Sequence, residues 1–593
     1  MQNRRRHEKK QFNEKRNHPK QIKGPTFFTP KKLQKKKNND VVFDNTFAIT
    51  FLRLSAPQQR LCLSLAIFMS LGYCAEALEN TNPMALGSVD KFIAAQTVIR
   101  TYEDMTPNFG NLATTHSMMA RTREMGFKGT FEFIYNDRCT KGTDDACRKV
   151  PIMFDLPKNI PIDYLDKETN IRFITFTEYG NQLNSNSVSS VEVSMVTGGW
   201  SIADTLSKIY KDNKWNFNIS NNDANMLNSK ASLTLTPWME KGCSNPNDKN
   251  DMGESSEIYF KHQENPIKLC HSPEQFLVAP FANYKQAKSY LHNTTNGQRI
   301  LKEKPALNSL LEIIENQSAN MLFAYGNGIP NVNCYNKDIP TQNCESREDL
   351  QSMLGIISGV RHAQTQTQEN LNKPVIIVVF KNYNETAKDL TNIIKNDAWD
   401  NYNFKGKENA EKMIKNQQLH TVFESVNIAD IDAKKKLSNL RSGSVLLLTL
   451  GSLPKTVFDG LYTHTGSHIW PAIREGENAK NSLILNGKPH FLITDDETTW
   501  EPSSVGFGPD NFDKNNLLNK KYNNMVFVTS KFWTELQPTE LISEYVTEAQ
   551  TPASSLSKYF AWLKEQAVKP ENDRILSAFE VVAEKLRASR KNL

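Results

Sequence analysis

The chain has 593 residues, enough for about two to four domains with a large apolar core. Its net charge of +7 combines 72 basic and 65 acidic residues, but residues 1–40 hold 14 Lys and Arg against three acids. The remainder carries 58 basic and 62 acidic residues, which excludes a generally basic body, and no specific nucleic acid is expected as a partner. Residues 1–45 are predicted to be a disordered basic tail, with nucleic-acid binding, an anionic membrane surface or targeting as alternatives.

An apolar stretch, residues 61–78, lies within a helical segment predicted at 46–95. About fifteen apolar or small residues precede Glu76, fewer than the roughly twenty that span a bilayer. This length fits a signal sequence or a buried helix, and the long basic flank fits a membrane anchor. Two interpretations stay open: an anchor or late signal in a membrane-associated or secreted protein, and a core helix in a cytoplasmic one.

The chain has eight cysteines, and six of them lie outside the apolar stretch. These six are spaced for local pairing: Cys139 with Cys147, Cys243 with Cys270, and Cys334 with Cys344. Their polar surroundings fit disulfides in an oxidising compartment, and reduced cysteines that are neighbours by chance are the alternative. None has the C-x-x-C spacing of zinc or redox sites.

Residues 96–300 have the pattern of a Rossmann-like domain. A Gly-bearing loop at 108–113 opens a helix at 114–125, and a strand at 131–135 follows, which is half of a βαβ unit. The other expected elements are strands at 171–178, 191–196, 231–236 and 276–279, a Gly198-Gly199 turn into a helix at 202–210, and a polar surface loop at 241–268. The second Gly-rich turn from strand to helix indicates repeated units, although such turns are common.

Residues 301–535 read as a second Rossmann-like domain. Helices are predicted at 306–314, 348–360 and 431–440, and strands at 320–325, 374–380, 420–426 and 444–450. Continuous apolar strands that alternate with helices indicate a parallel sheet covered on both faces. Residues 536–593 are predicted to be helices that pack back on the body.

The stretch 456–493 carries the clearest signal of a ligand site. A helix around 458–463 leads through an irregular segment to the loop 474–478, a second helix at 479–485, and an apolar strand at 490–493. A loop with acids and amides at a helix N-terminus, just before a buried strand, suits a ribose or a phosphate.

Two short motifs resemble those of the bacterial protein-arginine rhamnosyltransferases. Asn108-Phe109-Gly110, followed by an apolar residue and a helix, resembles their N-terminal Asp-Asn-Phe-Gly-Asp loop. Gly476-Glu477-Asn478-Ala479, followed by Gly487-Lys488-Pro489, resembles their donor motif, Gly-Glu-Asp-Ser followed at the same spacing by Gly-Lys-Pro. The resemblance covers about sixty residues and implies distant membership of the GT-B superfamily: two facing Rossmann-like domains that use a nucleotide-sugar donor.

The resemblance carries over unevenly. It implies that Glu477 binds the donor nucleotide, whereas Asn478 replaces an Asp and Ala479 replaces a Ser that helps to hold the diphosphate. Pro107 and Asn111 stand where the family has two Asp, one of them the catalytic base, and neither can accept a proton from an acceptor. Arginine modification is therefore not expected.

Other residues are candidates for the remaining roles. His116, Glu178 and Asp204 compete as replacements for the base, and each also has an ordinary interpretation as a helix or loop residue. Arg474 and Lys488 are available as cations for the diphosphate, with a surface role as the alternative.

Three further positions complete the candidate site. The resemblance places Asp459 on the donor side, where that family has an Asp before a Leu-Leu pair, and Gly110 with Asn111 would let the acceptor approach. No metal is expected, because the acidic run 495–497 reads as a solvated turn and GT-B enzymes usually lack a divalent ion.

The predicted function is sugar transfer from a nucleotide-sugar donor to an unknown protein, lipid or glycan acceptor. The main alternative is a catalytically inactive glycosyltransferase-like binding protein or secreted effector, because both family acids are missing. A third possibility is another Rossmann-type enzyme such as a sugar-nucleotide epimerase. The chain has no Gly-x-Gly-x-x-Gly after a strand, so no dinucleotide cofactor is expected.

Overall fold

The computed structural model describes residues 83–103, 110–136, 146–156, 161–197, 223–241, 252–263, 265–271, 275–325, 348–380, 383–399, 407–474, 477–492 and 538–591. Several predicted features lie outside these residues: the basic tail, the stretch 61–78, Asp204 with the Gly198-Gly199 turn, and the acidic run 495–497. Within the described part of the chain, none of the helices combines the length and apolar character that crossing a bilayer requires.

One predicted disulfide is partly visible. Cys270 is disulfide-bonded. Its pairing with Cys243 stays a prediction, because residue 243 lies outside the described residues.

The first domain is built on an eight-stranded sheet with the order β3-β4-β2-β1-β5-β6-β7-β8. Its strands are β1 (Val98–Glu103), β2 (Thr130–Tyr135), β3 (Asp163–Asp166), β4 (Ile171–Thr175), β5 (Val191–Thr197), β6 (Ser229–Lys241), β7 (Met252–Phe260) and β8 (Ile267–Cys270). The five central strands, from β4 to β6, are parallel to one another. Strand β3 at one edge, and β7 and β8 at the other, pair antiparallel.

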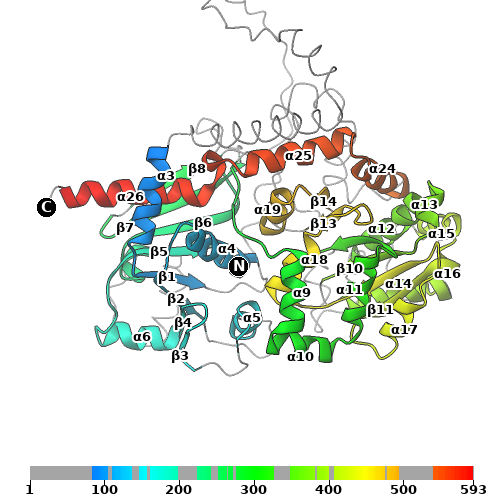
Figure 1. Ribbon diagram of the computed structural model, residues 1–593, viewed down its shortest axis with the longest axis horizontal. Coiled ribbons are helices and arrows are strands. Elements are labelled where there is room, and N and C mark those ends of the chain that lie inside the picture. The colour runs from blue at the N-terminus through cyan, green and yellow to red at the C-terminus, as the bar shows by residue number, and fades with distance from the viewer. Residues whose placement is uncertain are drawn as a thin grey trace, which may run out of the picture. The chain divides into compact units, whose positions relative to one another are not determined.

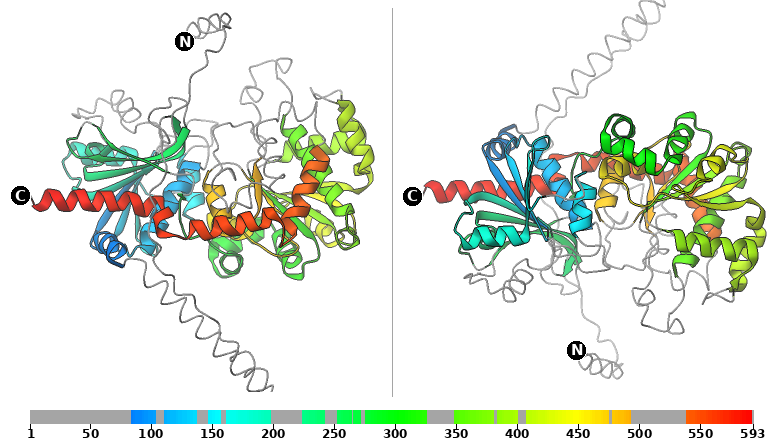
Figure 2. Two further views of the ribbon diagram at one scale, coloured as in Figure 1. Left: turned by 90° about the horizontal axis from the view of Figure 1, so that it is seen from above. Right: turned by 90° about the horizontal axis from the view of Figure 1, so that it is seen from below.

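Helices cover both faces of this sheet (Figures 1 and 2). They are α3 (Pro83–Ala94), α4 (Gly110–Glu124), α5 (Ala146–Met153), α6 (Phe176–Asn184), α8 (Asp223–Met226) and the last helix of the chain, α26 (Arg574–Lys591). One face packs in a core with α3, α4, α5 and α26, whereas the other packs with α6 and α8. The parallel strands need cover on both faces because apolar side chains point to both.

The second domain has a fully parallel six-stranded sheet with the order β11-β12-β10-β9-β13-β14. Its strands are β9 (Asn320–Ala324), β10 (Val375–Val379), β11 (Phe423–Asn427), β12 (Val445–Thr449), β13 (Ala472–Arg474) and β14 (His490–Leu492). Every residue of β10 is fully buried, which explains its uninterrupted apolar sequence.

The helices of this domain form the two outer layers around its sheet. They are α9 (Tyr284–Asn293), α10 (Thr295–Glu303), α11 (Ala306–Asn316), α12 (Glu348–Thr365), α13 (Gln368–Leu371), α14 (Asn384–Asn396), α15 (Lys407–Asn416), α16 (Leu419–Val422), α17 (Ala433–Ser438), α18 (Lys455–Tyr462), α19 (Glu477–Leu485), α24 (Pro538–Gln550) and α25 (Ser555–Ala567). One core includes α12, α14, α24 and α25, and the other includes α11, α17 and α18. The predicted fold class, α/β with two Rossmann-like domains, is confirmed.

Three expectations within the first half were wrong. The strand predicted at 171–178 ends at Thr175, whose hydroxyl caps α6 by accepting from the Glu178 N–H. The polar segment 241–268 contains β7 and the start of β8, and Ser255 and Ser256 on β7 are fully buried despite their polar side chains. Residues 276–279 form no strand beyond a single bridge from Phe276 to Asp573.

That bridge joins two segments that connect the domains. The Phe276 N–H donates to the carbonyl of Asn572 over 2.6 Å, and the Arg574 N–H donates to the carbonyl of Phe276 over 3.0 Å. Just before this point α25 packs in the second domain, and just after it α26 packs in the first. Both domains belong to one compact unit, Met84–Leu593.

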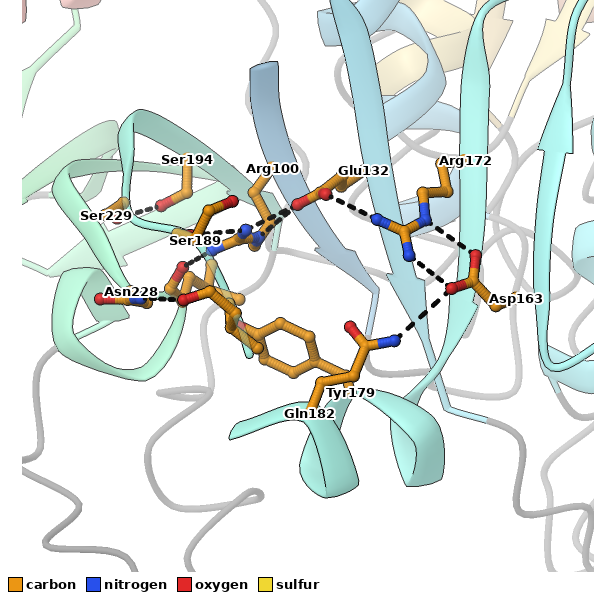
Figure 3. Close-up of polar contacts among 12 residues, drawn as sticks. Arg100, Glu132, Asp163, Arg172, Tyr179, Gln182, Ser189, Ser194, Asn228 and Ser229 are labelled. Carbon is orange, nitrogen blue, oxygen red and sulfur yellow. Dashed lines mark hydrogen bonds and ion pairs between the residues drawn. The ribbon is translucent and has the colours of Figure 1, made fainter. Parts of the chain in front are cut away.

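A chain of ion pairs, buried at Arg100 and partly exposed at Arg172 and Asp163, ties together β1, β2, β4 and β3 of the first sheet (Figure 3). The Arg100 guanidinium, 1% exposed, donates to Glu132, and Arg172 donates to Glu132 and to Asp163. Arg100 also lies over the ring of Tyr179 on α6. Each charged side chain of this network lies next to one of opposite sign, which offsets the free-energy cost of placing the charges beneath α6.

Helices α18 and α9 cross at Gly460. A Cβ atom at this position would lie 2.4 Å from the Ala287 Cβ and 2.6 Å from the carbonyl oxygen of Asn283. The crossing therefore requires glycine at 460, and this close approach fixes the position of α18 against α9.

We expect Gly460→Ala to lower the free energy of unfolding by about 1–3 kcal/mol, because the overlap outweighs the gain of about 1 kcal/mol in helix propensity. Thr456→Ala on the same helix is the control and should change stability by less than about 0.5 kcal/mol. Urea denaturation followed by circular dichroism measures both. A Gly460→Ala protein as stable as the wild type would show that α18 and α9 can move apart without loss of stability.

Candidate functional site at the boundary of the two domains

Each sheet has one point where the strand order reverses. In the first sheet it lies between β1 and β5, and in the second between β9 and β13. In open α/β sheets ligands bind outside the carboxyl ends of the strands at this point. The loop between β13 and α19, which carries the predicted donor motif, leaves the second sheet there.

The two reversal points are linked through helices α4 and α19. Helix α4 follows β1 and begins at Gly110, whereas α19 follows β13 and begins at Glu477. The Ser117 hydroxyl on α4 donates to the Asn478 Oδ1 over 3.2 Å. Two helix N-termini, each with partial positive charge, therefore belong to neighbouring helices at the domain boundary.

The start of α19 also contacts the segment that links the two domains. The Asn481 Oδ1 accepts from the backbone N–H of Leu277 over 3.2 Å. Ala479 is 7% exposed and packs in the second-domain core, so its side chain fills space beneath the helix start. Of Glu477 the structure describes the backbone position only, at the first residue of α19.

On α18, Lys455 and Asp459 form a buried ion pair. Their exposed fractions are 8% and 4%, and the ammonium lies 2.9 and 2.7 Å from the two carboxylate oxygens. The ammonium also lies 4.9 Å from the ring centre of Phe281. Burial raises the pKa of Asp459, and Lys455 opposes that rise. The negative charge of Asp459, the acid predicted on the donor side, is thus already neutralised by Lys455 one helical turn away.

His116 lies on α4, and its residue is partly buried. Burial, followed by the positive charge of Lys455, lowers the pKa of His116 to about 3. Its ring lies 5.4 Å from that of Phe154, between ring centres. The buried Nδ1 meets no hydrogen-bond partner among the described residues.

Two of the predicted cations are buried within the protein. Arg474, at the end of β13, is 0% exposed, and Lys488 is 2% exposed, so neither is a surface residue. The Lys488 ammonium donates to the Tyr462 carbonyl over 2.6 Å and lies 4.7 Å from the Phe323 ring centre. Burial lowers its pKa well below the usual range. This enclosure does not favour the expected contact between Lys488 and a diphosphate.

Glu178 lies in the first turn of α6, not at the end of a strand as predicted. Its carboxylate accepts from Gln182 on the same helix over 3.0 Å. Strand β4, which precedes α6, is separated from the reversal point by β2 and β1. With strands about 4.8 Å apart, this distance does not favour Glu178 as the base. Asp204 lies outside the described residues.

Some residues at this boundary were not predicted. Ser117 and the buried Glu103 reach it only through the fold, and Lys455 pairs with Asp459 on α18. Glu103 ends β1 and accepts from the Thr115 hydroxyl over 2.7 Å. A sequence signal existed for Lys455 alone, because a Lys four residues before an Asp on a helix can form an ion pair with it. Asn111, 8% exposed, lies near the start of α4 as expected.

No family model matches the chain, and no curated protein matches it in sequence. Similar solved structures include an α,α-trehalose-6-phosphate synthase from Burkholderia multivorans, with 9% identity, TM-score 0.36, and coverage of 84% of this chain and 98% of that one. A UDP-GlcNAc 2-epimerase from Neisseria meningitidis has 10% identity and TM-score 0.30, covering 83% and 99%. An alpha-glucosyltransferase in complex with UDP and DNA has 7% identity and TM-score 0.30, covering 80% and 100%. Likenesses this weak carry no weight for the function of this chain.

We expect Asp459→Leu to destabilise the protein by about 3–5 kcal/mol, because it leaves the Lys455 ammonium buried without its partner. The double variant Lys455→Met/Asp459→Leu should regain most of this loss, since both charges are then replaced by apolar groups. Chemical denaturation of the wild type, both single variants and the double variant measures the coupling. Additive losses would show that the pair does not act as a unit.

Proposed function

We propose that the protein is a glycosyltransferase of GT-B type that moves a sugar from a nucleotide-sugar donor to a protein, lipid or glycan acceptor. The observation that carries this proposal is the position of the loop between β13 and α19. The motif read as a donor loop from sequence leaves the second sheet at its reversal point, where α/β proteins bind ligands. The return of α26 to the first domain is also consistent with GT-B architecture.

The proposed donor site is formed by the start of α19. Glu477 contacts the ribose or base, and the backbone N–H groups of residues 477–479 face the diphosphate, where the helix dipole favours negative charge. Ala479 supplies no hydroxyl for this purpose, so backbone donors carry more of the binding. Gly110 and Asn111, at the start of α4, lie on the acceptor side.

The resemblance to protein-arginine rhamnosyltransferases does not extend to their acceptor. Pro107 and Asn111 replace the two acids of that family, and neither titrates as a carboxylate does. We therefore do not propose arginine as the acceptor. The same substitutions favour the second candidate function, a nucleotide-sugar-binding protein without transferase activity.

The two candidates differ in turnover, not in binding. A panel of labelled nucleotide sugars should reveal one that binds, and mass spectrometry of nucleotides that copurify with the protein would narrow the panel. Hydrolysis or transfer of the bound sugar supports the transferase, whereas binding without turnover supports the binding protein. A protein that neither binds nor consumes any nucleotide sugar would contradict both.

Glu477→Ala should weaken binding of the donor at least about tenfold, because one charge-assisted hydrogen bond contributes about 1.5–3 kcal/mol. Isothermal titration calorimetry with the nucleotide sugar identified in the panel measures the change. Glu411→Ala, at an exposed position of α15 in the same domain, is the control and should bind as the wild type does. An unchanged affinity of Glu477→Ala would remove this residue from the site.

A further inference from the structure

Helix α4 is held in place from two sides within the first domain. The Thr115 hydroxyl donates to the Glu103 carboxylate over 2.7 Å and is hydrogen-bonded to the Thr197 hydroxyl over 2.8 Å. Glu103 and Thr197 end β1 and β5, the two strands on either side of the reversal point. Further along the helix, the Arg121 guanidinium donates to Asp573, directly before α26, over 2.7 Å. The first domain therefore fixes the position of α4.

The same helix reaches the second domain through Ser117. Ser117 lies four residues before Arg121, so both side chains leave one face of α4. Ser117 is 1% exposed, and its hydroxyl donates to the Oδ1 of Asn478, the second residue of α19, over 3.2 Å. Helix α19 also contacts β6 of the first domain. The start of a second-domain helix is thus held by a helix that the first domain has already fixed.

Two amide side chains on α19 make these connections. Asn478 and Asn481 are three residues apart, so they lie on one face of the helix. Asn481 is 1% exposed, and its Oδ1 accepts from the backbone N–H of Leu277 in the segment that links the domains. The sequence motif predicts that Asn478 contacts the donor, but its side-chain oxygen is used by the first domain instead.

We infer that Asn478 is a positioning residue and not a ligand of the donor: its hydrogen bond with Ser117 holds the first turn of α19 so that the backbone N–H groups of residues 477–479 meet the diphosphate. This inference rests on the proposed function. It reassigns one residue of the predicted donor motif, and it adds Ser117 of the first domain to the groups on which donor binding depends.

The physical reason is the weakness of a free helix start. The first N–H groups of a helix have no partner within the helix, so its first turn opens easily unless other contacts hold it. An anion gains most from these groups when their directions are fixed before it arrives, because binding then costs less ordering. The hydrogen bond from Ser117 supplies such a contact, and its loss should weaken anion binding without removing any group that touches the anion.

Donor affinity tests the inference. UDP, dTDP and GDP are added in turn to the full-length protein, and isothermal titration calorimetry is continued with the nucleotide that binds. Ser117→Ala and Asn478→Ala should each weaken its binding about three- to tenfold, the effect of one lost hydrogen bond. The double variant should lose no more than either single variant, because both remove the same bond. Asn316→Ala, at an exposed position of α11, is the control and should bind as the wild type does.

Amide hydrogen exchange tests the hydrogen bond in the free protein. In both single variants, exchange in the segment 478–485 should become about three- to tenfold faster, because the start of α19 opens more often. Asn478→Asp keeps an acceptor oxygen for the Ser117 hydroxyl, so its exchange should stay slow. Unchanged exchange in the rest of the chain shows that the variants are folded. Unchanged exchange in 478–485 as well would show that the hydrogen bond does not hold the helix.

Kinetics separate positioning from a general structural loss. For a nucleotide sugar that is turned over, both single variants should raise KM about three- to tenfold and change kcat by less than about twofold, because the N–H groups bind the diphosphate before and during the reaction alike. A distorted or partly unfolded protein would lower kcat instead.

The outcomes distinguish this inference from the proposed function. If Asn478→Ala weakens nucleotide binding but Ser117→Ala binds as the wild type does, Asn478 contacts the donor directly, the positioning role is wrong and the proposed function stands. If exchange becomes faster in both variants while affinity stays the same, the bond serves only the packing of the domains, and the inference is overturned. If the wild type binds no nucleotide sugar or nucleoside diphosphate, the proposed function fails, and the positioning role fails with it.

Discussion

Parallel pairing is the constraint on which the rest of this structure depends. Parallel neighbours send the carboxyl ends of their strands to one edge of a sheet, and every strand then needs a helix to return to the other edge. Strands β1 and β13 end at the reversal points of their sheets, and the helices that follow them, α4 and α19, are neighbours. The loops most suited to hold a ligand therefore come from distant parts of the chain.

Buried polar contacts lie within α18 of the second domain and between α4 and α19, where the two domains meet. Lys455 and Asp459 neutralise each other, and a hydrogen bond joins Ser117 to Asn478. A core of apolar residues would serve stability as well or better, since a buried ion pair seldom adds net stability. Under the proposed function, the hydrogen bond between Ser117 and Asn478 would hold the start of α19, where the anionic donor is proposed to bind.

Much of the fold was predictable because buried parallel strands have a distinctive sequence. Strands β10 and β12 are runs of branched apolar residues, and both were found near their observed limits. The errors came where tertiary contacts overrule local pattern. Thr175 ends a strand by capping a helix, and β7 places small serines in a buried strand that looks polar from the sequence. The short strand β13 and the strand β1 were not predicted.

The sequence by itself determined the two α/β domains and the glycine spacing on which the proposed donor site rests, because hydrophobic periodicity and glycine spacing are local properties of the chain. It proposed His116 and Glu178 on equal terms, since either side chain can act as a base. Only the tertiary structure distinguished them: it placed His116 on α4, which contacts α19 of the second domain, and Glu178 on a helix two strands away from the reversal point. The reason is physical, because the strength and position of a base depend on charges and burial that arise only when distant segments pack together.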